Sequence, residues 1–180
     1  NPDGVKREGN RVMKKIISVL LALVLLLYTI GALSSCSTSY CLLYRLNDDY
    51  ETLSVVGVQN CIDTKIIIPS KYKGKSVTKV GDEAFESCTY LKTIIIPDSV
   101  TNIGYSAFWD CTGLTSITIG NSVTNIANGA FDGCSELANI IVDGDNLVYD
   151  SRENCNAIIE KETNKLIKGC KNTIIPNSVT

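Results

Sequence analysis

A segment of 23 residues that repeats three times in register constrains this chain more than any other feature of its sequence. The copies begin at Val77, Val100 and Val123 and read VTKVGDEAFESCTYLKTIIIPDS, VTNIGYSAFWDCTGLTSITIGNS and VTNIANGAFDGCSELANIIVDGD. A repeat of this length indicates that one supersecondary unit is stacked several times. The sequence therefore predicts a solenoid, in which each unit buries its apolar face only against its neighbours.

Eight columns of the repeat stay apolar in every copy, whereas the positions between them vary. A position that is fixed within one chain and apolar is expected to face the core. The columns are Val77/Val100/Val123, Val80/Ile103/Ile126, Ala84/Ala107/Ala130, Phe85/Phe108/Phe131, Cys88/Cys111/Cys134, Leu91/Leu114/Leu137, Ile94/Ile117/Ile140 and Ile96/Ile119/Val142.

The segments TIIIP, SITIG and NIIVD hold alternating β-branched residues, which predicts one strand per unit, stacked in parallel on its counterparts. The AFxxC segment is too short for an independent helix, and we expect one helical turn there, on the opposite wall. Near the N-terminus, LLYRLNDDYETLSVVGV predicts a β-hairpin that turns at Asp48-Asp49 and covers the first coil.

The pattern VTxIGxxAFxxCxxLxxIxIP resembles the BspA-like leucine-rich repeat of bacterial surface proteins, over roughly residue 53 to the C-terminus. The segment DTKIIIPSKYKGKSVTKVG is similar to the first coil of that family, and VYDSRENCNAIIEKETNKLIKGCKNTIIPNSVT is similar to its irregular repeat. The resemblance implies an α/β solenoid: a right-handed, leucine-rich-repeat-like coil with parallel strands on one wall, short helical turns on the other, and an N-terminal hairpin cap.

These patterns divide the chain as follows. Residues 1–12 are expected to be an upstream extension foreign to the natural protein, 13–35 a signal peptide, and 36–52 an anchor-proximal segment that begins the cap hairpin. Residues 53–180 are the predicted solenoid, with regular units 77–99, 100–122 and 123–145, an irregular repeat 146–176 and a truncated next repeat 177–180. Because no polar cap follows, we expect a fragment of a longer protein.

The leader predicts export. Met13-Lys14-Lys15 precede the apolar run IISVLLALVLLLYTIGA and the sequence LSSC, which is typical of a signal peptide. LSSC also resembles the bacterial lipoprotein box, which implies lipid attachment at Cys36 and a membrane-anchored or cell-surface location. An uncleaved membrane anchor and a plain signal peptide remain alternatives.

From Cys36 onward, 17 acidic and 12 basic residues give a net charge of −5, which argues against a nucleic-acid-binding protein.

The chain has no histidine and no CxxC motif, so common zinc sites, Ser-His-Asp triads and Cys-His pairs are not expected. Neither a cofactor nor a metal is predicted. Asp82, Glu83, Asp110 and Asp132 are interpreted as solvated turn residues, and Asp143-Gly144-Asp145-Asn146 as a polar turn.

The cysteines fall into separate groups. Cys88, Cys111 and Cys134 share one column and are predicted to be a structural ladder of buried thiols. A hairpin centred near Thr163-Asn164 would pair Ile159 with Leu166, Ala157 with Lys168 and Cys155 with Cys170, so Cys155 and Cys170 are a candidate disulfide. A bridge between Cys41 and Cys61 is a weaker possibility.

The candidate binding surface follows from strand alternation, because residues between inward-facing positions point outward. Two exposed aromatic residues of one coil, Tyr105 and Trp109, are added as possible contact residues. The alternatives are strand propensity alone for the strand positions, and cover of a neighbouring coil for Trp109. The predicted surface consists of Thr93, Ile95, Tyr105, Trp109, Ser116, Thr118, Asn139 and Ile141.

The resemblance implies a non-catalytic, adhesin-like platform, with host matrix or plasma proteins such as fibronectin and fibrinogen, or other bacterial surfaces, as partners. Two alternatives stay open. The repeats could be a targeting module of a longer secreted enzyme, or a glycan-binding module. For the glycan-binding module, Trp109→Ala should abolish polysaccharide retention but leave protein binding intact.

Overall fold

The computed structural model describes residues 41–179. The predictions for segments 1–12 and 13–35 and for lipid attachment at Cys36 lie outside these residues. No helix within residues 41–179 is long and apolar enough to cross a membrane.

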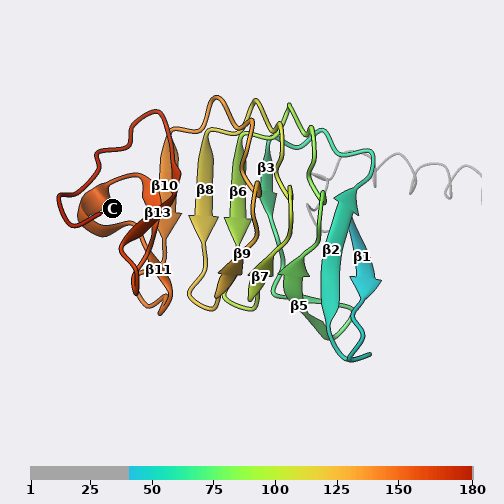
Figure 1. Ribbon diagram of the computed structural model, residues 1–180. Coiled ribbons are helices and arrows are strands. Elements are labelled where there is room, and N and C mark those ends of the chain that lie inside the picture. The colour runs from blue at the N-terminus through green and yellow to red at the C-terminus, as the bar shows by residue number, and fades with distance from the viewer. Residues whose placement is uncertain (1–40, 180) are drawn as a thin grey trace, which may run out of the picture. The chain divides into compact units, whose positions relative to one another are not determined.

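Four parallel strands form one wall of the solenoid. They are β3 (Lys65–Ile67), β6 (Thr93–Ile96), β8 (Ser116–Ile119) and β10 (Asn139–Val142), in the spatial order β10-β8-β6-β3 (Figure 1). Ile94 pairs with Ile117, and Ile117 with Ile140, so β6, β8 and β10 follow one another at the 23-residue repeat, whereas Ile66 of β3 pairs with Ile94, 28 residues later. The prediction of parallel, in-register strands on this four-stranded wall is confirmed.

A second wall also consists of strands, of which the sequence analysis predicted only the two arms of the N-terminal hairpin. This six-stranded wall contains β1 (Leu42–Leu46), β2 (Leu53–Val58), β4 (Lys71–Tyr72), β5 (Lys75–Val80), β7 (Asn102–Ile103) and β9 (Asn125–Ile126). The strands β2, β5, β7 and β9 run parallel, and β4 pairs antiparallel with β5. The VTxI segments of the repeat are therefore short strands.

The predicted helical turns at AFxxC are wrong. These segments form consecutive turns that stack on one another, and the only helical element among the described residues is a 3-10 turn, η2 (Arg152–Asn154). Two features prevent a helix. Glu83, Ser87 and Asp110 have positive φ, and alternate amides bond to the next coil, as from Phe85 N to Ala107 O at 2.8 Å and from Phe108 N to Ala130 O at 2.8 Å. This turn wall is a hydrogen-bonded ladder between coils.

The core lies between the three walls and contains the apolar columns of the repeat. Phe85, Phe108 and Phe131 stack with nearly parallel rings, at centroid distances of 5.0 Å and 5.4 Å. Seven of the eight columns are buried in all three copies, and the exception is Ile126, which is only partly buried. The repeat thus predicted the core of the regular coils, whereas the buried residues of the N-terminal hairpin, the first coil and the C-terminal sheet lie outside its columns.

The N-terminal hairpin is confirmed. Strands β1 and β2 pair antiparallel, and β2 joins β5, so the hairpin extends the six-stranded wall at its N-terminal end. Asp49 fixes the turn by accepting hydrogen bonds from the Thr52 hydroxyl at 2.6 Å and from the backbone N–H groups of Thr52 and Glu51 at 2.9 Å. The Thr52 side-chain bond, followed by these backbone bonds, lowers the pKa of Asp49 to about 2.

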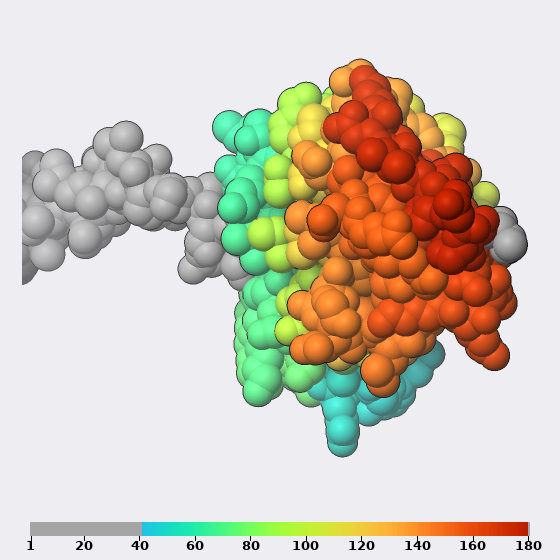
Figure 2. Space-filling view, turned by 90° about the vertical axis from the view of Figure 1, so that its left-hand side faces the viewer, coloured from blue at the N-terminus to red at the C-terminus, as the bar shows by residue number. Residues whose placement is uncertain are grey.

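The C-terminal region departs from the regular repeat. It forms a three-stranded antiparallel sheet of β11 (Tyr149–Asp150), β12 (Ala157–Glu160) and β13 (Lys165–Gly169). Figure 2 views the solenoid from this end, where the late residues, in orange and red, cover the face. The irregular repeat therefore closes much of the end of the stack.

Asn146 joins the last regular coil to this sheet. Its side chain is fully buried; the amide nitrogen donates to Gly120 O at 2.9 Å and Val123 O at 3.0 Å, and the oxygen accepts from Val148 N at 2.9 Å and Tyr149 N at 2.8 Å. The segment Asp143–Asn146 is a polar turn, as interpreted. Its last residue, however, is a buried structural element.

Candidate functional site

The outer face of the four-stranded wall presents one aligned pair of residues per strand. Strand pairing aligns Ile67, Ile95 and Thr118, and continues to Ile141, so β-branched side chains form a continuous row across four coils. Ile67 and Ile141 are 45% and 52% exposed. The second row consists of Lys65, Thr93, Ser116 and Asn139. We call these eight residues the strand face.

Six of the eight predicted surface residues thus lie on the strand face: Thr93, Ile95, Ser116, Thr118, Asn139 and Ile141. They are partly or fully exposed, while Ile94, Ile117 and Ile140 between them are buried. The sequence analysis missed Lys65 and Ile67 of β3. The signal was present, because KIIIP in the first coil matches TIIIP of the regular repeat.

Tyr105 and Trp109 lie on the turn wall instead of the strand face. Their side chains are 57% and 44% exposed, while their backbones are held in the ladder. Tyr105 N donates to Asp82 Oδ1 at 2.9 Å, and Trp109 O accepts from Ser87 N at 2.8 Å. The predicted surface therefore divides between two walls, and a role of the aromatic pair in binding stays a prediction.

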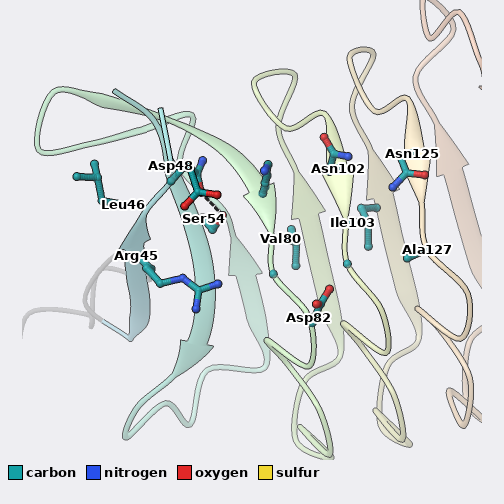
Figure 3. A pocket seen from close by; sticks show the side chains of 14 residues that line it. Arg45, Leu46, Asp48, Ser54, Val80, Asp82, Asn102, Ile103, Asn125 and Ala127 are labelled. Carbon is teal, nitrogen blue, oxygen red and sulfur yellow. Dashed lines mark hydrogen bonds between the residues drawn. The ribbon is translucent and has the colours of Figure 1, made fainter. Parts of the chain in front are cut away.

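A groove of about 620 Å³ lies on the six-stranded wall and was not predicted. Strand pairing places Arg45, Ser54, Lys79, Asn102 and Asn125 in one row across five strands. Figure 3 shows Arg45 and Asp48 at the hairpin end and Asn102 and Asn125 further along the wall. The lining is polar, with both signs of charge.

The signal for this groove was the polar column Lys79/Asn102/Asn125, which precedes the buried column Val80/Ile103/Ile126 in every repeat. The sequence analysis did not use it, because it assigned no strand to the VTxI segments. Strand alternation, once the segments are known to be strands, makes these side chains point outward.

The cysteine ladder is buried, as predicted. Cys111 Sγ lies 3.0 Å from Phe85 O, and Cys134 Sγ lies 3.2 Å from Phe108 O, so each thiol donates to a carbonyl of the preceding coil. Burial raises the pKa of all three thiols, that of Cys134 to about 11. These thiols pack as small apolar groups.

We expect the folded protein to protect this ladder from alkylation. A rise in the pKa of Cys134 from 9.0 to about 11 lowers its thiolate fraction about a hundredfold, and burial slows its reaction further. Iodoacetamide at pH 8, followed by peptide mass spectrometry, should modify Cys134 at least about a hundredfold more slowly in the folded than in the unfolded chain. Equal rates in the two states would contradict this assignment.

The candidate disulfide is not supported. Cys155 and Cys170 are both free thiols, and Cys170 Sγ donates to Asn156 O at 3.1 Å and Ala138 O at 3.2 Å. Ile159 pairs with Leu166 as predicted, but an irregularity between Ile158 and Ile159 places Ala157 opposite Gly169 instead of Lys168. The predicted register for a Cys155–Cys170 bridge is therefore lost.

The carboxylates of the turn wall have structural partners. Asp82 accepts the Tyr105 amide of the next coil, and Asp132 forms an ion pair of 3.5 Å with Lys168. Among residues 41–179, no aspartate or glutamate is buried. A general acid or base usually needs a shielded carboxylate with a perturbed pKa, and the described residues do not offer one.

Comparison with known proteins supports the same architecture. The family described as BspA type leucine rich repeat region (6 copies) matches residues 57–159, more than half of the chain. The chain belongs to this family. Members of this family are built on a leucine-rich repeat scaffold, and the match in this protein runs from Gly57 to Ile159, part-way into the irregular repeat.

Two solved structures share the fold. A leucine-rich repeat protein of T. pallidum is 28% identical, with a TM-score of 0.55 over 59% of this chain and 49% of that chain. A leucine-rich repeat protein of Bacteroides ovatus is 31% identical, with a TM-score of 0.51 over 56% of this chain and 27% of that chain. The chain thus matches half or less of the length of these proteins. No curated protein sequence matches it significantly.

Proposed function

We propose that this BspA-type repeat protein is a non-catalytic binding protein whose strand face contacts other proteins. The observation that carries the proposal is the row Ile67, Ile95, Thr118 and Ile141, which is β-branched in every strand and lies on an exposed sheet surface. An aligned, mostly apolar row beside polar residues is typical of a protein-interaction surface.

The strand face suits a broad, flat partner. Its backbone is held by four hydrogen-bonded strands, so little conformational entropy is lost when a partner binds. The neighbouring row, with Lys65, Thr93, Ser116 and Asn139, supplies hydrogen-bonding groups beside the apolar row. Such an arrangement combines apolar contact with polar groups that orient the partner.

The location and partners that we propose follow from the leader and from the family. The signal sequence at 13–35 and Cys36 support an exported protein anchored to a membrane by lipid. On a cell surface, the strand face would act as an adhesin-like platform for host matrix or plasma proteins, or for other bacterial surfaces.

Substitution of the exposed isoleucines tests this function. The full chain is measured by surface plasmon resonance against immobilised plasma fibronectin and fibrinogen, beside the triple variant Ile67→Thr/Ile95→Thr/Ile141→Thr. Threonine keeps the β-branch and hence the strand preference, while it removes apolar contact. We expect binding of the full chain to at least one ligand, and a loss of at least about tenfold in the triple variant.

The matched control is Ile62→Thr/Ile174→Thr/Ile175→Thr, which makes the same exchange at three exposed isoleucines outside the strand face. This control should bind within about twofold of the unchanged chain, since isolated exposed residues contribute little. Equal losses in both triple variants would contradict the strand face as the contact surface. Failure of the unchanged chain to bind either protein would contradict these partners.

A further inference from the structure

Three potential metal ligands meet where the N-terminal hairpin contacts the first coil. Cys41 directly precedes β1, while Cys61 and Asp63 lie in the segment between β2 and β3. The backbone fixes this approach, because Gln59 N donates to Cys41 O at 2.8 Å. The two thiol sulfurs and a carboxylate oxygen all lie within 4.8 Å of one another. Among residues 41–179, no other three cysteine, aspartate or glutamate side chains come together in this way.

This cluster differs from the buried cysteine ladder in what its sulfur atoms face. In the ladder, Cys111 and Cys134 each donate to a backbone carbonyl. At the hairpin, Cys41 Sγ lies 3.6 Å from Asp63 Oδ2 and shares its surroundings with a second thiol. Cys41 and Cys61 are 2% and 7% exposed, and Asp63 is half-buried. A carboxylate therefore reaches two sulfurs that are shielded from water.

We propose that Cys41, Cys61 and Asp63 bind a thiophilic divalent cation of the zinc class, with water as the fourth ligand. Two sulfur ligands select such a cation over calcium or magnesium, which prefer oxygen. Zinc–sulfur and zinc–oxygen distances of about 2.3 Å and about 2.0 Å place tetrahedral ligands roughly 3.5 Å apart. The separation of 3.6 Å between Cys41 Sγ and Asp63 Oδ2 already fits this geometry, and the other separations, which are at most 4.8 Å, need only a small contraction. Each thiol loses its proton to solvent as its sulfur coordinates the metal.

The site is independent of binding at the strand face and has a structural consequence. Cys41 begins the cap hairpin, whereas Cys61 and Asp63 lead into β3, the first strand of the four-stranded wall. A bound cation would tie the cap to the first coil and stabilise the folded state by mass action. The sequence analysis did not anticipate it, because the ligands follow no CxxC spacing and include no histidine.

Cobalt titration of the reduced full chain under anaerobic conditions tests the site, since sulfur coordination to Co²⁺ gives a near-ultraviolet charge-transfer band. We expect one Co²⁺ per chain, a band displaced by Zn²⁺, and affinity that falls as the pH falls. Cys61→Ser should halve the band and weaken binding at least about tenfold. Asp63→Asn should keep the band but weaken binding by a similar factor, which tests the site even if Cys61→Ser fails to fold.

Cys170→Ser is the matched control, because it removes a half-buried thiol outside the cluster. It should leave the stoichiometry, the band and the affinity unchanged. Absence of the band in the unchanged chain, or its persistence at full intensity in folded Cys61→Ser, would overturn the proposal. It would also be overturned if mass spectrometry of the chain isolated without reductant showed a Cys41–Cys61 disulfide.

Discussion

Replacement of Asn146 by leucine is expected to destabilise the protein by about 4 kcal/mol, because it removes four hydrogen bonds from a fully buried side chain. Leucine has a similar volume, so the effect comes from polar groups that lose their partner. The amides of Val148 and Tyr149 and the carbonyl of Val123 are the groups most affected. Equilibrium unfolding of the full chain in urea measures the change.

The matched control for this experiment is Asn128→Leu, which makes the same exchange at an exposed position. A surface substitution of this kind is expected to change stability by no more than about 0.5 kcal/mol. If Asn146→Leu lowered the free energy of unfolding no more than Asn128→Leu, the hydrogen bonds of Asn146 would not stabilise the junction between the regular coils and the C-terminal sheet.

The variant Asn146→Asp adds a pH dependence that leucine cannot show. One carboxyl oxygen would keep the hydrogen bonds from Val148 N and Tyr149 N, which lower the pKa, while the other would face the carbonyl oxygens of Gly120 and Val123. We expect burial and this repulsion to outweigh the two amides and to raise the pKa in the folded state. A raised pKa makes the variant lose stability as the pH rises. The stability difference from the unchanged chain should therefore be smaller at pH 4 than at pH 7, and an equal difference at both would contradict the geometry.

Phe108→Ala is expected to cost about 3–5 kcal/mol, the range for removal of a buried aromatic ring. Phe108 is fully buried and stacks on Phe85 at 5.0 Å and on Phe131 at 5.4 Å. Each coil of a solenoid is stabilised through its neighbours, so the cavity should weaken both flanking coils. Urea unfolding gives the magnitude, and amide hydrogen exchange should show reduced protection from Gly81 to Cys134.

Phe131→Ala provides the comparison within the same column. Phe131 stacks on one phenylalanine, Phe108, whereas Phe108 stacks on two, and Phe131 is 3% exposed. The loss of stability in Phe131→Ala should therefore be smaller than in Phe108→Ala. If Phe131→Ala lost as much stability as Phe108→Ala or more, the phenylalanine with two stacking neighbours would stabilise the solenoid no more than the one with a single stacking neighbour.

The repeat correctly predicted the buried columns, but the prediction of helical turns at AFxxC was wrong. One physical reason explains both outcomes. Ile94, Ile117 and Ile140 are buried because strand alternation and the repeat period act together, and both can be read from sequence. The backbone at Glu83 and Ser87 was mispredicted as helical, because its amides bond to carbonyls one repeat away, at Tyr105 and Trp109. Local propensity says nothing about such partners.

The candidate sites show the same division. Ile95, Thr118 and Ile141 could be assigned to an outer surface from alternation alone, and the pairing of the strands agrees. The Cys155–Cys170 register failed because one irregularity at Ile158 shifts the pairing by a residue. A strand bulge depends on how the sheet packs, so sequence spacing alone does not locate it.

The sequence by itself determined the 23-residue period, the buried columns, the parallel strands and the membership of a leucine-rich repeat family, because these follow from patterns that recur along the chain. Only the tertiary structure decided the turn ladder, the groove beside Asn102 and Asn125, the buried bonds of Asn146, and the meeting of Cys41 with Cys61 and Asp63. These features arise between residues 20 or more positions apart, or from loops without periodicity. Chain packing sets their geometry.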